Sequence, residues 1–197
     1  MIYSSEMVLD GRCDSDSAYG GRVLDAQNIL LIRPSALGDV CRTVPVLASL
    51  RGAAPQARID WLVQTEFMGA VQHHPALSSV LGFPRKRLSL GNIFRNDGRL
   101  AIQELSRNLR TNPRYDLVID CQGLARSGLF AFLSGAKRRV GYTNAEELGW
   151  IWINKRIHAP RSMHTVDRML SLVESLGIEV VRDMRLYTDK TSQAFAS

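Results

Sequence analysis

The feature that most constrains the fold is an alternation of short apolar runs with segments of helical periodicity. Five runs have the length and composition of buried strands. They span residues 28–33, 58–63, 78–83, 115–120 and 138–142. Strands that alternate with helices form a parallel sheet covered on both faces. The sequence therefore predicts an α/β fold built on a doubly wound parallel sheet.

Three segments between or after these runs carry apolar side chains at helical spacing, each set on one face. The three sets are Val40, Val44, Leu47 and Ala48; Ile102, Leu105 and Leu109; and Val166, Met169, Leu170, Val173 and Leu176. Gly177 is placed to end the last helix. Pro45 allows two starting points for the first of these helices. The helix begins near Gly38 and is kinked at Pro45, or it begins near Thr43 with Pro45 in its first turn.

The 197 residues are enough for one well-cored domain. We expect a flexible polar leader over residues 1–27, which lacks the pattern of a secretory signal. The globular domain is expected over residues 28–180. Residues 181–197 are predicted to be a linker or the start of a further domain, and the run from Ile178 onward begins like another strand.

The chain carries a formal net charge of +6, with an estimated pI of about 9.6. Such an excess favours an anionic partner, either phosphate groups, nucleic acid or an acidic membrane surface, although a solvated basic surface explains it equally simply. Cys13, Cys41 and Cys121 are scattered, which fits a reduced cytosolic protein rather than a disulfide framework. No spacing of histidines or cysteines predicts a metal site, and no apolar run is long enough to cross a bilayer.

The loop at residues 34–43 follows the first predicted strand, where ligands bind in open α/β sheets. It lacks the glycine pattern of a dinucleotide-binding loop and the lysine of a P-loop. Gly38 permits a tight turn or a positive φ. Asp39 has two interpretations: an acidic residue resting on a helix N-terminus, or a general base facing a cleft.

A second loop, at residues 120–128, follows the fourth predicted strand. Gln122, Gly123, Arg126 and Ser127 form a compact set of donors there, suited to hydroxyl or phosphate groups, or else a polar turn with ordinary capping. Two basic clusters complete the candidates. One, formed by Arg85, Lys86 and Arg87, lies at a carboxyl end of the sheet and favours ligand contact. The other, formed by Lys137, Arg138 and Arg139, favours a structural role.

Three segments together resemble glycosyltransferase family 9, the ADP-heptose:lipopolysaccharide heptosyltransferases. Residues 29–51 (ILLIRPSALGDVCRTVPVLASLR) resemble the opening strand, the loop with its serine, glycine and aspartate, and the Thr-x-Pro helix of that family. Residues 115–128 (YDLVIDCQGLARSG) resemble its Asp-x-Gln-Gly-Leu signature, and residues 164–168 (HTVDR) a shorter third one. The resemblance runs from about Asn28 to about Gly177.

The resemblance implies the N-terminal, acceptor-side Rossmann-like domain of a GT-B glycosyltransferase. The implied reaction is inverting and metal-independent, and transfers a heptose from ADP-heptose to a hydroxyl of a phosphorylated core or Kdo–lipid A acceptor. Asp39 is implied as the base, with Ser35 and Gly38 in its loop. The cluster from Arg85 to Arg87 is implied to meet acceptor phosphates and carboxylates. No cofactor and no nucleic acid is implied, and the protein is expected in the cytoplasm, with peripheral contact at the inner membrane.

The sequence departs from the family pattern at several places. Arg42 stands where some members carry histidine, and Ala145 stands where an arginine is expected. No second Rossmann unit follows Gly177, so donor-binding residues are not assigned and the chain alone is expected to be inactive. The alternative is a non-catalytic remnant or a module that binds an anionic glycan or a partner. An unrelated nucleotide-binding domain is disfavoured by the missing glycine-rich loop.

Overall fold

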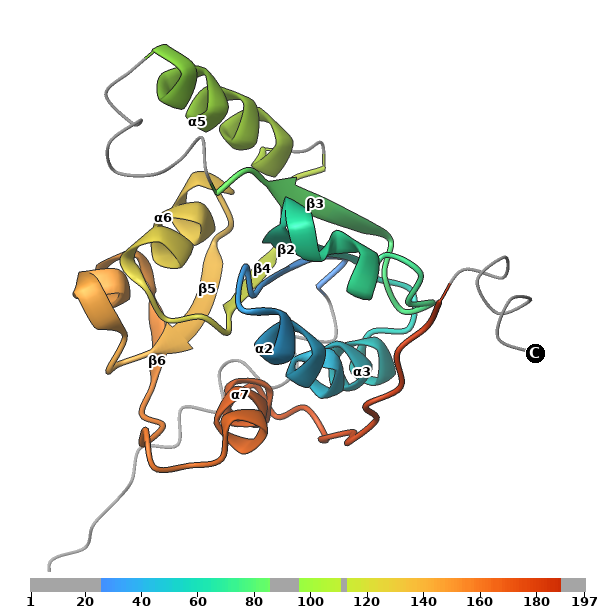
Figure 1. Cartoon of the computed structure of the whole chain (residues 1–197). Helices are drawn as coiled ribbons and strands as arrows, with labels where there is room; N and C mark the ends of the chain where they lie inside the picture. Colours follow the sequence, from blue (N-terminus) through green and yellow to red (C-terminus); the bar gives the residue numbers. More distant parts are fainter. Residues whose placement is uncertain (1–25, 86–95, 111–112, 189–197) are drawn as a thin grey trace, which may run out of the picture.

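The computed structural model describes residues 26–85, 96–110 and 113–188 (Figure 1). In this part of the chain six strands form one parallel sheet in the order β3-β2-β1-β4-β5-β6. The strands are β1 (Asn28–Ile32), β2 (Arg58–Gln64), β3 (Ser79–Phe83), β4 (Leu117–Asp120), β5 (Arg138–Tyr142) and β6 (Lys155–Ile157). This is the strand order of a Rossmann fold, and the predicted doubly wound parallel sheet is confirmed.

The central strand β1 is buried along its whole length because it pairs with β2 and β4 at its edges and a hydrophobic core covers each of its faces. Successive side chains of a strand point to opposite faces. Ile29 and Leu31 therefore enter one hydrophobic core, whereas Leu30 and Ile32 enter a second core on the other face. An uninterrupted apolar run is what such a strand requires.

Helices cover both faces of the sheet (Figure 1). The first core is closed by α2 (Leu37–Arg42), α3 (Val44–Ala53) and α7 (Thr165–Glu174). The second is closed by α5 (Asn96–Leu109) and α6 (Ala125–Leu133). Two segments of 3-10 turns, η2 (Thr65–Ala70) and η3 (Glu146–Trp152), follow β2 and β5. In the part of the chain described, no helix combines the length and apolarity needed to span a membrane.

Pro45 lies at the start of α3, and Thr43 separates α3 from the short helix α2, so each proposed helix start is partly right. The strand expected from Ile178 onward is wrong: residues 178–188 contain no strand and run along α3. The amide of Val181 donates to the buried hydroxyl of Ser49 at 2.9 Å. Apart from residues 26 and 27, the predicted leader lies outside the described residues, as do residues 189–197.

Candidate functional site

The strand order reverses between β1 and β4, and the loops after these two strands lie together at the carboxyl edge of the sheet. Arg33, at the end of β1, joins them. Its Nη1 donates to the carbonyl oxygen of Cys121 at 2.6 Å, and its Nη2 lies 2.6 Å from Oδ2 of Asp39. The amide of Ser35 also donates to Oε1 of Gln122, at 3.4 Å. Such a switch point is where open α/β sheets bind ligands.

Asp39 lies in the first turn of α2, but Ala36 occupies the N-cap position, so the Asp39 side chain does not cap the helix. The carboxylate is held by guanidinium groups instead. Besides Arg33, Nη1 of Arg42 lies 3.5 Å from Oδ1. The side chain of Arg33 is 9% exposed and that of Asp39 is 30% exposed. Asp39 is thus fixed by a buried cation while its carboxylate still reaches solvent.

Asp39 opens onto a pocket of about 140 Å³ between the sheet edge and the start of α7; we call it the Asp39 pocket. Its charged wall is mainly cationic, because the guanidinium groups of Arg33, Arg161 and Arg168 all line it. Arg168 stacks on the Tyr142 ring at 4.1 Å, and its buried Nε has no hydrogen-bond partner among the described residues. A pocket of this charge suits an anionic group.

Asp120, at the end of β4, organises the second loop. Its Oδ1 accepts from the amides of Gln122 and Gly123 at 2.9 and 3.2 Å, and its Oδ2 accepts from the hydroxyl of Ser127 at 2.8 Å. Burial raises the pKa of the Asp120 carboxyl to about 6, against the opposing effect of these hydrogen bonds. Burial also raises the pKa of the neighbouring Cys121 thiol, which is free and buried.

The second loop borders a separate pocket of about 190 Å³, which we call the loop pocket. It gathers five of the predicted site residues, together with Pro34, Phe83, Leu124 and Glu147. The five are Ser35, Arg85, Gln122, Arg126 and Ser127. The guanidinium of Arg126 lies 6.0 Å from the Phe83 ring centre, which is the outer limit of a cation–π contact. The two pockets therefore divide the candidate residues, with Asp39 in one and the donors in the other.

Three other predicted site residues, Gly38, Gly123 and Ser127, have structural roles in the two loops. Gly38 lies inside α2 without a positive φ, so the turn predicted there is wrong. Gly123 has the positive φ, 72°, and a Cβ at this position would lie 2.9 Å from Tyr142. Ser127 was predicted as a ligand donor, but its buried hydroxyl donates to Asp120 and accepts from the Leu124 amide, so here the structure favours the alternative of a capped polar turn.

The structure describes the second basic cluster completely but only Arg85 of the first. Arg85 is exposed at the edge of the loop pocket, whereas Lys86 and Arg87 lie outside the described residues. In the second cluster, Arg139 donates to the carbonyl oxygens of Trp152 and Ala136 at 2.7 and 2.6 Å, which agrees with the structural role expected for it. Within the described ranges, no group of three metal-ligating side chains comes together.

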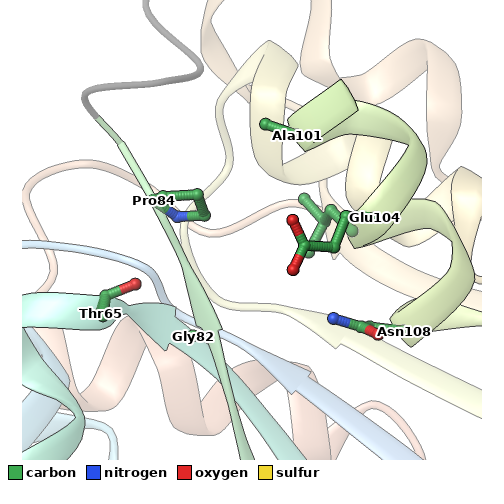
Figure 2. Close-up of a pocket in the computed structure, with 7 residues that line it drawn as sticks. Thr65, Gly82, Pro84, Ala101, Glu104 and Asn108 are labelled. Atoms are coloured by element: carbon green, nitrogen blue, oxygen red, sulfur yellow. The ribbon is translucent and has the colours of Figure 1, made fainter. Parts of the chain in front are cut away.

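A third concavity, also of about 190 Å³, lies between β3 and α5 (Figure 2). None of the predicted site residues lines it. Glu104 and Asn108 of α5 face Thr65 across the gap, with Gly82 and Pro84 along the strand (Figure 2). The Glu104 carboxylate makes this pocket less suitable than the other two for an anionic ligand.

Sequence reasoning missed Arg33, Arg161 and the buried Asp120, and it noted Arg168 without giving it a site. The signal for Arg33 was a cation at the end of an otherwise apolar strand, which is costly to bury unless it is paired. Asp120 had a similar signal at the end of β4. Arg161 and Arg168 lie more than 120 residues after Asp39, and no local pattern indicates that they share a pocket with it.

The fold is that of a Rossmann-like domain with two arginine-lined pockets near its switch point. The family model for glycosyltransferase family 9 (heptosyltransferase) matches residues 102–196. Lipopolysaccharide heptosyltransferase 1 of Escherichia coli K12 is 28% identical over 153 residues, which are 76% of this chain and 47% of that protein. The corresponding protein of Pseudomonas aeruginosa is 37% identical over 102 residues, or 50% and 27% of the two chains.

A solved structure titled E. coli heptosyltransferase WaaC with ADP-2-deoxy-2-fluoro heptose superimposes with a TM-score of 0.69 at 26% identity. The match covers 79% of this chain and 50% of that one. Over most of its length the chain is therefore similar to glycosyltransferase family 9. It spans about half the length of the curated relatives it matches.

Proposed function

We propose that this chain is the acceptor-side half of a heptosyltransferase. The whole enzyme would transfer heptose from ADP-heptose to a hydroxyl of a phosphorylated core or Kdo–lipid A acceptor. The observation that carries the proposal is the Asp39 carboxylate, fixed by Arg33 at the mouth of a cationic pocket. The similarity to a heptosyltransferase solved with an ADP-heptose analogue supports the donor. The protein would act in the cytoplasm, in peripheral contact with the inner membrane.

Asp39 would act as the general base. Arg33 holds its Oδ2, while the partly exposed carboxylate can accept a proton from the acceptor hydroxyl. As that proton moves to Asp39, the acceptor oxygen forms a bond to the anomeric carbon. The bond from this carbon to ADP breaks, and ADP leaves with the electron pair. Attack from the side opposite ADP inverts the anomeric centre, and this chain's part in the reaction requires no metal ligand.

The two pockets would hold the anionic acceptor. Arg161 and Arg168 would face groups close to the reacting hydroxyl, and Arg85 and Arg126 would face groups farther away, in the loop pocket. Gln122 and Ser35 would contribute polar contacts there. Gly38, Gly123 and Ser127 would shape these loops, and Lys86 and Arg87 would extend the cationic surface.

Binding of the acceptor and transfer of the heptose can be tested separately. The chain should bind a soluble, phosphorylated Kdo-containing acceptor analogue, measured by calorimetry. Asp39→Asn should keep this affinity within about twofold, because a base contributes mainly to the transition state. Arg126→Gln should weaken binding roughly tenfold, as expected for the loss of a charged hydrogen bond. Gln103→Ala, at an exposed position on α5, is the matched control.

Turnover should require a donor-binding domain in the same polypeptide, because both substrates must be held in one cleft. This chain alone should release no ADP from ADP-heptose. With a donor domain present, Asp39→Asn should lower kcat by about 10²-fold or more while KM for the acceptor changes little. An unchanged kcat would remove Asp39 from the chemistry. Absence of acceptor binding by the wild-type chain would instead favour a remnant without this function.

A further inference from the structure

Large apolar side chains are exposed on η3 and on the adjoining end of α6. Leu148 is 61% exposed, Ile151 51% and Phe132 49%. Trp150 and Trp152 lie half-buried beside them, and the rings of Phe132 and Trp152 are 5.0 Å apart. We call these five residues the η3 patch. The orange turns beside α6 in Figure 1 lie at the outer edge of the molecule, away from α2 and α3.

The backbone of η3 holds this patch outward. Glu147 and Leu148 have φ values of 53° and 62°, which residues with a Cβ rarely adopt. Gly128 and Gly149 let η3 approach α6 closely: a Cβ on Gly128 would lie 2.5 Å from the Gly149 carbonyl oxygen, and a Cβ on Gly149 would lie 2.6 Å from Leu124. Leu148 is therefore exposed by a fixed and unusual turn.

Two arginines lie against the aromatic rings of the patch, while the exposed Glu146 and Glu147 directly precede Leu148. The guanidinium of Arg156 lies 4.8 Å from the Trp150 ring centre, and that of Arg139 lies 5.7 Å from the Phe132 ring centre. Lys137 is exposed nearby, and its carbonyl oxygen accepts from the side chain of Asn154. Aromatic and aliphatic side chains with arginines at their rim are typical of surfaces that lie in the headgroup region of a membrane.

We propose that the η3 patch docks on an anionic lipid surface. The charge favours lipid over a second copy of the chain, because a two-fold contact through this patch would bring its cations together. Glu147 connects the patch to the loop pocket, which it also lines. The inference rests on the proposed function in one respect: a docked η3 patch would hold the loop pocket at the membrane surface, where a glycolipid acceptor presents its sugars.

The test is co-flotation of the purified chain with vesicles of phosphatidylcholine, with and without phosphatidylglycerol. We expect binding to the anionic vesicles that weakens with salt. Leu148→Ser with Ile151→Ser should lower the partition coefficient roughly tenfold, since two exposed apolar side chains no longer enter the lipid. Arg156→Gln should lower it severalfold. Met184→Ser with Leu186→Ser, at similarly exposed positions on the segment along α3, is the matched control and should bind like the wild type.

Equal binding by the Leu148→Ser, Ile151→Ser variant would overturn the proposal, as would no binding by the wild type. Dimerisation lost in the same variant, seen by sedimentation velocity, would make the patch a protein interface instead. The vesicles contain no glycolipid, so their binding does not depend on the acceptor site. The double variant should bind the soluble acceptor analogue normally. Failure of vesicle binding alone would thus contradict membrane docking, and failure of acceptor binding alone would contradict the proposed function.

Discussion

The Asp120 carboxylate is buried at the end of β4, so its protonation is coupled to folding. Burial raises its pKa to about 6 from an ordinary value of 3.8. Between these values the folded state keeps a proton that the unfolded state releases. The contribution of Asp120 to the free energy of unfolding should therefore fall as pH rises from about 4 to about 6, by about 3 kcal/mol in all. Above this range the contribution is constant.

Asp120→Asn should remove this dependence, because an amide does not titrate and its oxygen can still accept from the Gln122 and Gly123 amides. Urea unfolding at a series of pH values measures it. Glu174→Gln, at an exposed position on α7, should retain the wild-type slope. If Asp120→Asn retained the same slope, another group would be responsible.

At this same scale, the sequence predicted the site only where neighbouring residues carry it. Asp39, Gln122 and Arg126 belong to short local patterns, and the structure gathers Gln122 and Arg126 with Ser35 at one pocket. Arg33 and Arg161 could not be found in this way. Arg161 reaches the pocket of Asp39 and Arg33 because the chain returns after β6 through α7, which packs against α2 and α3, and no local spacing encodes this.

Among the elements, the loop after β4 depends on one glycine. Gly123 and Gly135 both have a φ of 72°, but a Cβ on Gly123 would also lie 2.9 Å from Tyr142, whereas a Cβ on Gly135 would meet nothing within 4 Å. Gly135→Ala should cost only the backbone strain, about 1 kcal/mol. Gly123→Ala should cost about 2–3 kcal/mol, because Tyr142 is buried and cannot move freely.

Chemical denaturation of both variants measures the difference, with Gly135→Ala as the control for the positive φ. Equal losses would mean that Tyr142 yields to the new methyl group. Because Tyr142 also carries the stacked Arg168 side chain, we expect Gly123→Ala to weaken acceptor binding as well.

Four of the correctly predicted elements share one property, which is a continuous or periodic apolar pattern that predicts their burial. β1, β2, β4 and α7 are of this kind, and each lies against a core. β6 was missed because it is a three-residue edge strand of sequence Lys-Arg-Ile, with charges where a central strand would be apolar. The strand expected after Ile178 failed for the opposite reason: its apolar residues pack beside α3 without pairing to the sheet.

For the whole molecule, one sheet separates two cores, so neither core can lose its strands without exposing the other. This predicts a single cooperative unfolding transition. The three tryptophans test it, because Trp61 lies in the core under α2, α3 and α7, whereas Trp150 and Trp152 lie on η3 against α6. Trp61→Phe leaves reporters on one side of the sheet, and Trp150→Phe with Trp152→Phe leaves a reporter on the other.

In each variant, the urea midpoint from tryptophan fluorescence should equal the midpoint from far-ultraviolet circular dichroism. Comparing two probes within one variant removes the effect of the substitution on stability. If the fluorescence of Trp150 and Trp152 changed at lower urea than the circular dichroism, η3 and α6 would unfold before the sheet. The η3 patch would then be a locally unstable region, and its positive-φ turn would not hold Leu148 outward in the way that membrane docking requires.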